Sequence, residues 1–359
     1  MNQIKKILFG IILLLLFSGF CCEKSVVQAV NLNLQVVPDY PDMTGSIYYN
    51  MHKASHYEAN GQQELAIKEY LQVLELKPDD LIARYNLGSL YYERWLDLSK
   101  NQDTLNEAYK YLDLAEEEFL WINEISPGIV MVYFKLGRIA SIKEEYESAI
   151  AYYTSARKLA PKNYVVCFNL ATIYEETGEI DLAIVSYKDA VNLNKDFTHA
   201  YNNLGLLYER RGNLEQAIKY YNKALKTNKK YVYSHLNLGS LYTLEENYKK
   251  ASKHFAIAKE LEPSNPWVYL HTGYMYDAQG KYIQAFKEYS VYVKLKPLNP
   301  KGYYLICSVL KKLNMPSEAM MAGILYLKLD PQGEHSSEVK GIIKEIQNDI
   351  IKSSNISKE

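Results

Sequence analysis

Residues 198–231 read THAYNNLGLLYERRGNLEQAIKYYNKALKTNKKY, and this stretch decides the fold. Apolar side chains in its first half have the spacing of an amphipathic helix: Tyr201, Leu204, Leu207 and Tyr208. Gly212 and Asn213 then interrupt the pattern, as turn residues do. A second apolar set with helical spacing follows the turn: Leu214, Ala217, Ile218, Tyr221, Ala224 and Leu225. The stretch therefore predicts two short antiparallel helices joined by a tight turn.

The same pattern recurs along most of the chain. An alanine returns every 34 residues: Ala149, Ala183, Ala217, Ala251, Ala285 and Ala319. A glycine precedes several of these alanines by 12 residues: Gly137, Gly205, Gly239 and Gly273. A tyrosine keeps a third fixed position: Tyr174, Tyr208, Tyr242 and Tyr276. A constant period of this size indicates one small structural unit repeated in tandem.

The recurring glycine and alanine are the smallest residues in faces that are otherwise apolar and bulky. We expect the two helices of each unit to approach each other closely at these positions. Larger side chains would then over-pack the contact, and we expect Ala217→Leu to destabilise the fold.

The combination of Leu204-Gly205, Tyr208, Ala217 and Tyr221, with a proline just after the second helix, resembles the tetratricopeptide repeat. The resemblance implies an all-α fold, a right-handed superhelical solenoid of about eight helix-turn-helix repeats plus a C-terminal capping helix. Boundaries placed by the alanine give these copies: 47–80, 81–129, 130–163, 164–197, 198–231, 232–265, 266–299 and 300–333. The terminal copies depart from the pattern, as expected where a stack ends: Ala54 and Cys307 take the glycine position and Gly323 a tyrosine position.

The second copy is longer than the others by 15 residues. Either Ala108 or Ala115 can hold its alanine position. We favour Ala108, because the hexamer EAYKYL around it resembles QAIKYY of the fifth copy. This placement predicts a first helix extended through Trp95, a polar loop at 99–103 and a second helix two turns longer than usual. The elongated hairpin is either a tolerated insertion or a dedicated partner contact.

Helix ends support these boundaries. Asn265-Pro266 and Asn299-Pro300 place a capping asparagine before a proline at the first helical position. After the last copy we predict a capping helix at 334–351, with Ser336-Ser337 as its N-terminal cap. This helix would cover the final apolar surface of the stack. Its apolar residues share one face: Val339, Ile342, Ile343, Ile346 and Ile350. Residues 352–359 form a polar tail.

The first 22 residues have the features of an export signal. Lys5 and Lys6 precede an apolar run at 7–20, and Cys21 and Cys22 follow it. As a helix the run spans roughly 21 Å, which is short for a hydrocarbon core about 30 Å thick. The cysteines resemble the lipid acceptor of bacterial lipoprotein signal peptides, although Ser18, Gly19 and Phe20 fit that pattern imperfectly.

Three fates of the leader stay open: lipidation at Cys21 or Cys22, which we favour, an uncleaved anchor, or simple secretion. Residues 23–46 contain Pro38, Pro41 and Gly45 without a helical period, which predicts a flexible tether. We therefore expect an exported protein of the bacterial cell envelope, held to the membrane by an N-terminal lipid or anchor.

Charge and cysteine usage exclude other classes. The chain has 41 Lys and Arg against 42 Asp and Glu, so we expect no nucleic-acid partner. A local group of lysines on second helices is interpreted as a solvated outer face: Lys223, Lys226, Lys229, Lys230, Lys249, Lys250 and Lys253. Cys167 and Cys307 belong to separate copies, which predicts two buried free thiols rather than a disulfide.

The sequence contains no recognisable catalytic motif, so we expect no enzyme and no cofactor. His52 and His56 are four residues apart, but no third ligand lies near them, so we expect no metal site. Several carboxylates fall on or near the predicted inner face without forming an acid/base pair: Glu93, Glu175, Glu176, Glu209 and Asp277.

An asparagine ladder is the best candidate for a binding site. Asn169, Asn203 and Asn237 recur every 34 residues, and Asn86 holds the equivalent place in the second copy. The resemblance places this position in the concave groove, where an amide can donate to and accept from any peptide bond. The ladder either binds an extended peptide by its backbone or only stabilises neighbouring helices.

Aromatic residues on the predicted inner face would supply apolar pockets beside the ladder: Tyr85, Phe134, Phe168, Tyr233 and Trp267. Trp267, at a helix start, is the best candidate for exposure. The sequence thus predicts a non-enzymatic scaffold that binds a protein or peptide in a concave groove. An alternative is an accessory subunit that recruits or regulates a cell-wall or glycan-processing enzyme.

Overall fold

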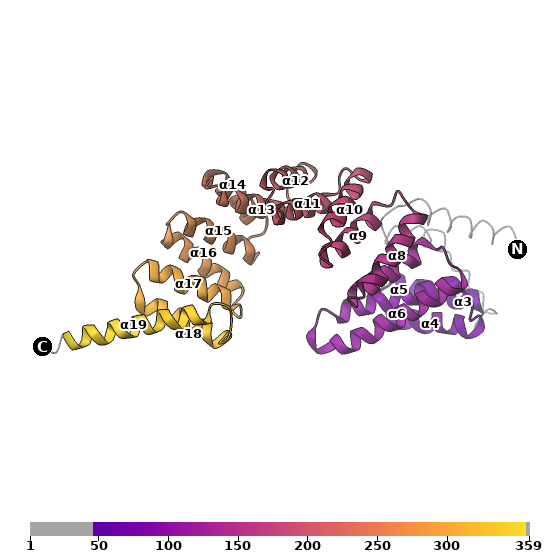
Figure 1. Cartoon of the computed structure of the whole chain (residues 1–359). Helices are drawn as coiled ribbons and strands as arrows, with labels where there is room; N and C mark the ends of the chain where they lie inside the picture. The colour runs from indigo at the N-terminus through magenta and orange to yellow at the C-terminus, as the bar shows by residue number, and fades with distance from the viewer. Residues whose placement is uncertain (1–45, 357–359) are drawn as a thin grey trace. The chain divides into compact units, whose positions relative to one another are not determined.

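The computed structural model describes residues 46–356, and the side chains of all of these except 102 and 350–356. The described part of the chain consists of 17 α-helices and one short 3-10 helix, with no strand (Figure 1). Within the described residues it divides into two compact units, 46–194 and 195–356. The predicted all-α fold of about eight helical hairpins and a final helix is confirmed.

Each repeat pairs a first helix with a second helix, and these pairs have the most extensive contacts in the molecule. The first helices are α3 (Ile47–Ala59), α5 (Leu81–Leu98), α7 (Val130–Ile142), α9 (Tyr164–Glu176), α11 (Thr198–Arg210), α13 (Val232–Leu244), α15 (Pro266–Ala278) and α17 (Pro300–Lys312). The second helices are α4 (Gln63–Leu76), α6 (Leu105–Ile125), α8 (Tyr146–Leu159), α10 (Ile180–Leu193), α12 (Leu214–Thr227), α14 (Tyr248–Leu261), α16 (Tyr282–Leu295) and α18 (Pro316–Leu329).

The recurring glycine lies against an aromatic ring on the second helix of its own repeat. A Cβ added to Gly239 would lie 2.5 Å from Cε1 of Phe255, and one added to Gly205 would collide with the Tyr221 ring. The recurring alanines of the second helices, such as Ala217, are fully buried in the same interface. The small residues at these positions therefore allow the two helices to approach each other closely, as predicted.

The extended second repeat has the predicted shape but a different register. Helix α5 continues to Leu98, the short helix η1 (Gln102–Thr104) follows, and α6 is seven residues longer than the other second helices. A Cβ added to Gly88 would lie 3.1 Å from Cζ of Phe119, so Phe119 takes the place of Tyr221. Counting back four residues puts Ala115 in the alanine position, and the preference for Ala108 was wrong. Ala108 is also fully buried, in the added turns, which explains why its hexamer resembles the repeat.

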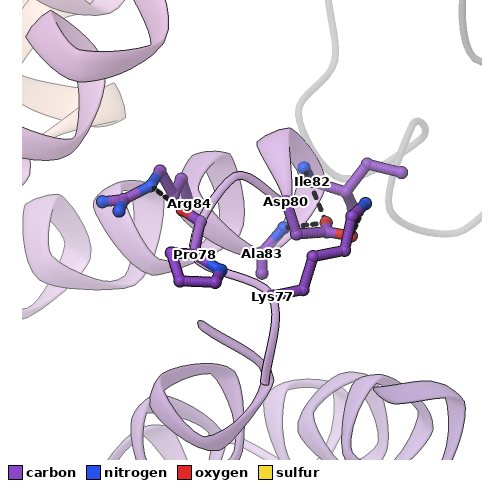
Figure 2. Close-up of polar contacts among 6 residues, drawn as sticks. All are labelled: Lys77, Pro78, Asp80, Ile82, Ala83 and Arg84. Carbon is purple, nitrogen blue, oxygen red and sulfur yellow. Dashed lines mark hydrogen bonds and ion pairs between the residues drawn. The ribbon is translucent and has the colours of Figure 1, made fainter. Parts of the chain in front are cut away.

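A polar side chain caps most of the first helices. Asp80 Oδ1 accepts hydrogen bonds from the backbone N–H groups of Ile82 and Ala83, both at 3.1 Å, and its Oδ2 accepts from Lys77 Nζ (Figure 2). Arg84 Nε donates to the carbonyl of Pro78 in the same turn, so this junction between repeats is fixed from both sides. The predicted caps are confirmed, because Asn265 and Asn299 accept from the N–H groups of Trp267 and Lys301. Capping satisfies helix-start donors that otherwise have no partner.

The final helix α19 (Ser336–Ile356) covers the last repeat, as expected for a capping helix, and it continues beyond the predicted end at residue 351. Val339 is fully buried, and Ile342 and Ile346 are nearly so. The predicted leader at 1–22 with Cys21 and Cys22, and the tether up to residue 45, lie outside the described residues. Within residues 46–356, no helix combines the length and apolar character that a membrane span requires.

Candidate functional site

Two first helices of the second unit begin without the polar cap that their repeat position favours. Counted in steps of 34, the capping position is occupied by Ile129, Asn163, Phe197, Tyr231, Asn265 and Asn299, and Ile129 provides no side-chain cap for α7. The three asparagines accept backbone hydrogen bonds, whereas Phe197 and Tyr231 provide no side-chain cap for α11 and α13. Replacing a good cap by a non-capping residue costs about 1 kcal/mol of stability. The chain therefore accepts a local cost at two consecutive repeats to place aromatic rings there.

These two rings belong to a continuous string of four. The ring centroids of Phe197 and His199 are 6.1 Å apart, those of His199 and Tyr231 are 5.2 Å apart, and those of Tyr231 and Tyr233 are 5.6 Å apart. His199 and Tyr233 are exposed, and Tyr233 is 53% exposed. Phe197 and Tyr231 are half-buried, and burial raises the pKa of the Tyr231 phenol. We call Phe197, His199, Tyr231 and Tyr233 the aromatic string.

Trp267 repeats the position of Tyr233 one copy later, as the second residue of α15. It is 45% exposed, which agrees with its expected exposure, and its ring centroid is 6.2 Å from that of Tyr292. Tyr48 holds the same position in the first repeat and is also exposed. The second residue of a first helix is thus a surface position, whereas Phe134 and Phe168 are half-buried against Tyr153 and Tyr187.

Asn203 and Asn237 lie one helical turn after His199 and Tyr233, on the same faces of α11 and α13, and both are half-buried. Asn237 Nδ2 donates to Oδ1 of Asn202 at 3.2 Å, and this oxygen also accepts from the buried Ser234 hydroxyl at 2.9 Å. These bonds join α11 to α13. Part of the amide capacity of Asn237 therefore stabilises the repeat junction, and its second N–H and its carbonyl give it further capacity.

The other two ladder residues lie in the first unit. Asn86 Nδ2 donates to the hydroxyl of Tyr70 at 3.0 Å, so it too connects consecutive repeats. Asn169 is half-buried and forms a hydrogen bond with Tyr153. The structure places Asn203 and Asn237 beside the aromatic string, and Asn86 and Asn169 in the other unit, where they contact buried tyrosines.

Carboxylates of the inner faces mostly serve the same buried tyrosines. The hydroxyls of Tyr70, Tyr187 and Tyr221 donate to carboxylates 12 residues earlier in the chain: Glu58 at 3.0 Å, Glu175 at 3.2 Å and Glu209 at 2.7 Å. Burial, and then the hydrogen bond to Glu209, raises the pKa of the Tyr221 phenol. Asp277 instead forms an ion pair with Lys312 at 2.7 Å. The three glutamates thus join the two helices of their own hairpins, and Asp277 joins α15 to α17 of the next repeat.

Reactive or metal-binding groups do not gather in the described part of the chain. Cys167 and Cys307 are free and buried, as predicted, and burial raises the pKa of the Cys307 thiol to about 11. No set of three histidine, cysteine or acidic side chains within residues 46–356 is placed to hold a metal ion.

Sequence reasoning missed Phe197, His199 and Tyr231. The signal was present in the 34-residue register, because the capping position changes from asparagine to an aromatic residue in two adjacent copies and then back again. A repeat position that breaks its own local rule is where function is expected.

Comparison with known proteins agrees with the repeat architecture. Family models described as tetratricopeptide repeat match residues 132–163 and 199–231, and one described as TPR repeat matches 56–94 and 171–212. No curated protein matches the sequence.

Several solved structures are similar in fold. A tetratricopeptide repeat protein from Parabacteroides merdae is 22% identical, with a TM-score of 0.52 over 72% of this chain and 99% of that one. PilW, a type IV pilus biogenesis factor, is 20% identical, with a TM-score of 0.55 over 59% of this chain and 98% of that one. The Cut9–Hcn1 structure is 17% identical, with a TM-score of 0.55 over 85% of this chain and 56% of that one. The matches identify tetratricopeptide repeats at residues 56–94, 132–163 and 171–231 of this chain.

Proposed function

We propose that this chain is a non-enzymatic scaffold that binds a protein or an extended peptide on the first-helix faces of its second unit. The aromatic string is the observation that carries this proposal. Exposed or half-buried aromatic side chains provide large, rigid contact area, and such residues dominate the binding energy of interfaces. Two of the four, Phe197 and Tyr231, occupy positions where a capping asparagine would stabilise the helix better.

The ladder amides of Asn203 and Asn237 would complete the site. Each lies one turn from a ring of the string, so a bound chain that packs side chains on the rings passes next to an amide. An amide pairs with a peptide group of any sequence, since it both donates and accepts. The rings would then select apolar side chains, and the amides would hold the backbone. Trp267 would extend the same surface by one repeat.

The site in the first unit is proposed to be weaker. Asn86 and Asn169 occupy the same ladder position, and Asn86 is bonded to Tyr70 as Asn237 is to Asn202, so the ladder alone favours neither unit. The capping positions that precede α5 and α9 hold Asp80 and Asn163, which act as caps, and the one before α7 holds Ile129, which is neither a cap nor aromatic. We therefore assign the principal binding surface to repeats five to seven.

We further propose that the scaffold acts at the bacterial cell envelope, on the periplasmic or surface side. The charged and then apolar leader with Cys21 and Cys22 supports export and membrane attachment through a lipid or an anchor. Metabolic labelling with a tritiated fatty acid tests this part separately. Incorporation that is lost in a Cys21→Ala, Cys22→Ala variant is expected, and an unlabelled wild-type chain would exclude lipidation.

Site-specific photo-crosslinking in intact cells tests the binding surface. A benzophenone amino acid at Tyr233 is expected to give discrete crosslinked polypeptides, identified by mass spectrometry. The matched control carries the same probe at Tyr48, which has the same repeat position and similar exposure but lies outside the string. Equal products at both positions would contradict the assignment. Retention of the chain on purified cell-wall material, abolished by Tyr233→Ala, would instead favour the accessory role toward a wall or glycan enzyme.

A further inference from the structure

The near-zero net charge of the chain conceals a division between its two units. Residues 1–194 contain 17 Lys and Arg against 26 Asp and Glu, a net charge of −9. Residues 195–359 contain 24 Lys and Arg against 16 Asp and Glu, a net charge of +8. One half of the molecule is thus acidic and the other is basic by nearly the same amount.

The positive charge of the second unit is concentrated on two consecutive second helices, α12 and α14. Six lysines on them are exposed: Lys219, Lys223, Lys226, Lys249, Lys250 and Lys253. None of the six forms an ion pair with any residue between 46 and 356. We call these six residues the lysine surface.

Aromatic residues beneath the lysine surface hold part of it in place. Lys223 Nζ lies 4.9 Å from the ring centroid of Tyr220, and Lys250 Nζ lies 4.8 Å from that of Tyr242. Tyr242, the ring beneath Lys250, also packs in one apolar cluster with Ile218 and Tyr221 of α12, so the support of this α14 lysine is joined to the core of the preceding repeat. Cation–π contacts restrict these side chains without neutralising their charge.

Exposed carboxylates without ion pairs gather at two neighbouring turns of the first unit. Glu144, Glu145 and Glu147 lie at the turn between α7 and α8, and Glu176 and Glu179 lie at the turn between α9 and α10. All five are exposed, and within the described chain none has a basic partner. Helices α8 and α9 pack together, so the two turns belong to consecutive repeats. We call these five residues the acidic edge.

From these charges we propose that the chain self-associates head to tail, with the acidic edge of one copy docked on the lysine surface of the next. Complementary charge is the reason for choosing a second copy as the partner. The chain itself carries both surfaces, with nearly equal and opposite net charge in its two units. The lysines on α12 and α14 repel one another, and this repulsion is reduced when carboxylates approach. Because the two surfaces differ, the contact is heterologous and leaves one free surface at each end of a dimer, so it can extend.

This contact is separate from the proposed peptide site. The lysine surface lies on second helices, whereas the aromatic string lies on the starts of first helices. Self-association would therefore display several peptide sites along one assembly, which raises the apparent affinity for a multivalent partner. Failure of one proposal leaves the other intact.

Sedimentation velocity of the full chain tests the proposal. At low salt we expect the sedimentation coefficient to rise with protein concentration. In 0.5 M NaCl it should fall to the monomer value, because exposed charges are screened.

Charge-reversal variants test the two surfaces separately. The triple variant Lys219→Glu, Lys223→Glu, Lys253→Glu should raise the dissociation constant Kd of self-association by at least about tenfold. Glu144→Lys with Glu145→Lys and Glu147→Lys should do the same. Mixing the two triple variants is expected to restore a one-to-one dimer, since each retains the surface that the other has lost.

A control separates specific contact from total charge. Lys328→Glu with Lys340→Glu and Lys344→Glu changes the net charge equally on α18 and α19, and it should leave self-association unchanged. A wild-type chain that stays monomeric at both salt concentrations overturns the proposal. So does association that survives both charge reversals, or a monomer whose lysine surface binds vesicles containing phosphatidylglycerol. Circular dichroism of each variant checks that the fold is retained.

Discussion

In the eighth repeat, Cys307 occupies the position that Gly205 has in the fifth repeat, and Gly323 occupies the position of Tyr221. The small and the larger residue of the helix contact are thus interchanged. A Cβ added to Gly323 would lie 3.4 Å from Cys307 Sγ, so the two residues face each other across the last hairpin. The same Cβ would lie 3.0 Å from Cγ1 of Val339 on the capping helix. The space that a tyrosine fills in other repeats is therefore filled by α19, and the glycine is what admits the cap.

Substituting Gly323→Leu should displace the capping helix. The added side chain meets Val339 and Ile343 at once, and over-packing of this kind costs about 1–3 kcal/mol. Hydrogen exchange should become faster in residues 339–346, while α11 and α12 keep their protection. Gly341→Ala on the same helix is the matched control, because nothing lies within 4 Å of its added Cβ. Unchanged exchange in the Gly323 variant would contradict this explanation of the cap.

Ala217→Leu should destabilise the fold by about 1–3 kcal/mol, since Ala217 is fully buried where α11 meets α12. Thermal unfolding followed by circular dichroism measures the effect. Ala256→Leu, the same change at an exposed position of α14, should stay within about 0.5 kcal/mol of wild type. Coinciding melting curves for wild type and Ala217→Leu would refute the close-approach argument.

Two buried tyrosines should respond oppositely to loss of their hydroxyls. Tyr221 donates to Glu209 at 2.7 Å, so Tyr221→Phe should cost about 1 kcal/mol. The hydroxyl of Tyr289 is buried and has no hydrogen-bond partner among residues 46–356, so Tyr289→Phe should be neutral or stabilising. Chemical denaturation of both variants makes the comparison, and equal losses of stability would contradict the hydrogen-bond assignment.

Stability of the second unit should fall in mild acid. Burial, together with the nearby His235 and Lys253, lowers the pKa of His254 to about 4, and burial together with the nearby Lys301 lowers the pKa of His271 to about 4. Because the unfolded state takes up protons at higher pH than the folded state, this stability is complete above pH about 6.5 and is lost progressively toward pH 4.

Melting temperatures at pH 7.5 and pH 5.0 measure the acid effect. Wild type should melt at a lower temperature at pH 5.0, and the double variant His254→Gln, His271→Gln should show a smaller difference. His56→Gln, at an exposed histidine, serves as the control and should keep the wild-type difference. An unaltered difference in the double variant would mean that other groups cause the acid sensitivity.

The fold was predictable because the small and the large residues of the helix contact recur with the same 34-residue period. Gly205, Ala217 and Tyr221 specify a close helix contact by size alone, and their recurrence defines the repeats. The register of the second repeat was not predictable, since both Ala108 and Ala115 are buried small residues with helical neighbours. Only the ring of Phe119 against Gly88 decides between them.

The candidate site was predictable in part. Asn203, Asn237 and Trp267 stay predicted site residues, and the sequence did not show that Asn237 is bonded to Asn202. Phe197 and Tyr231 were overlooked because an aromatic residue in a repeat resembles core. The lack of a side-chain cap at Phe197 and Tyr231 becomes informative only when the helix starts are known.

Restoring the missing caps tests the central claim most directly. Phe197→Asn with Tyr231→Asn removes half of the aromatic string and supplies two capping side chains, each worth about 1 kcal/mol. The free energy of unfolding and the yield of the crosslink from position 233 are measured on the same variant. We predict that stability is unchanged or higher while the crosslinked partner is lost. A variant that is destabilised by more than about 2 kcal/mol and still captures the partner would show that these rings are core and not a binding surface.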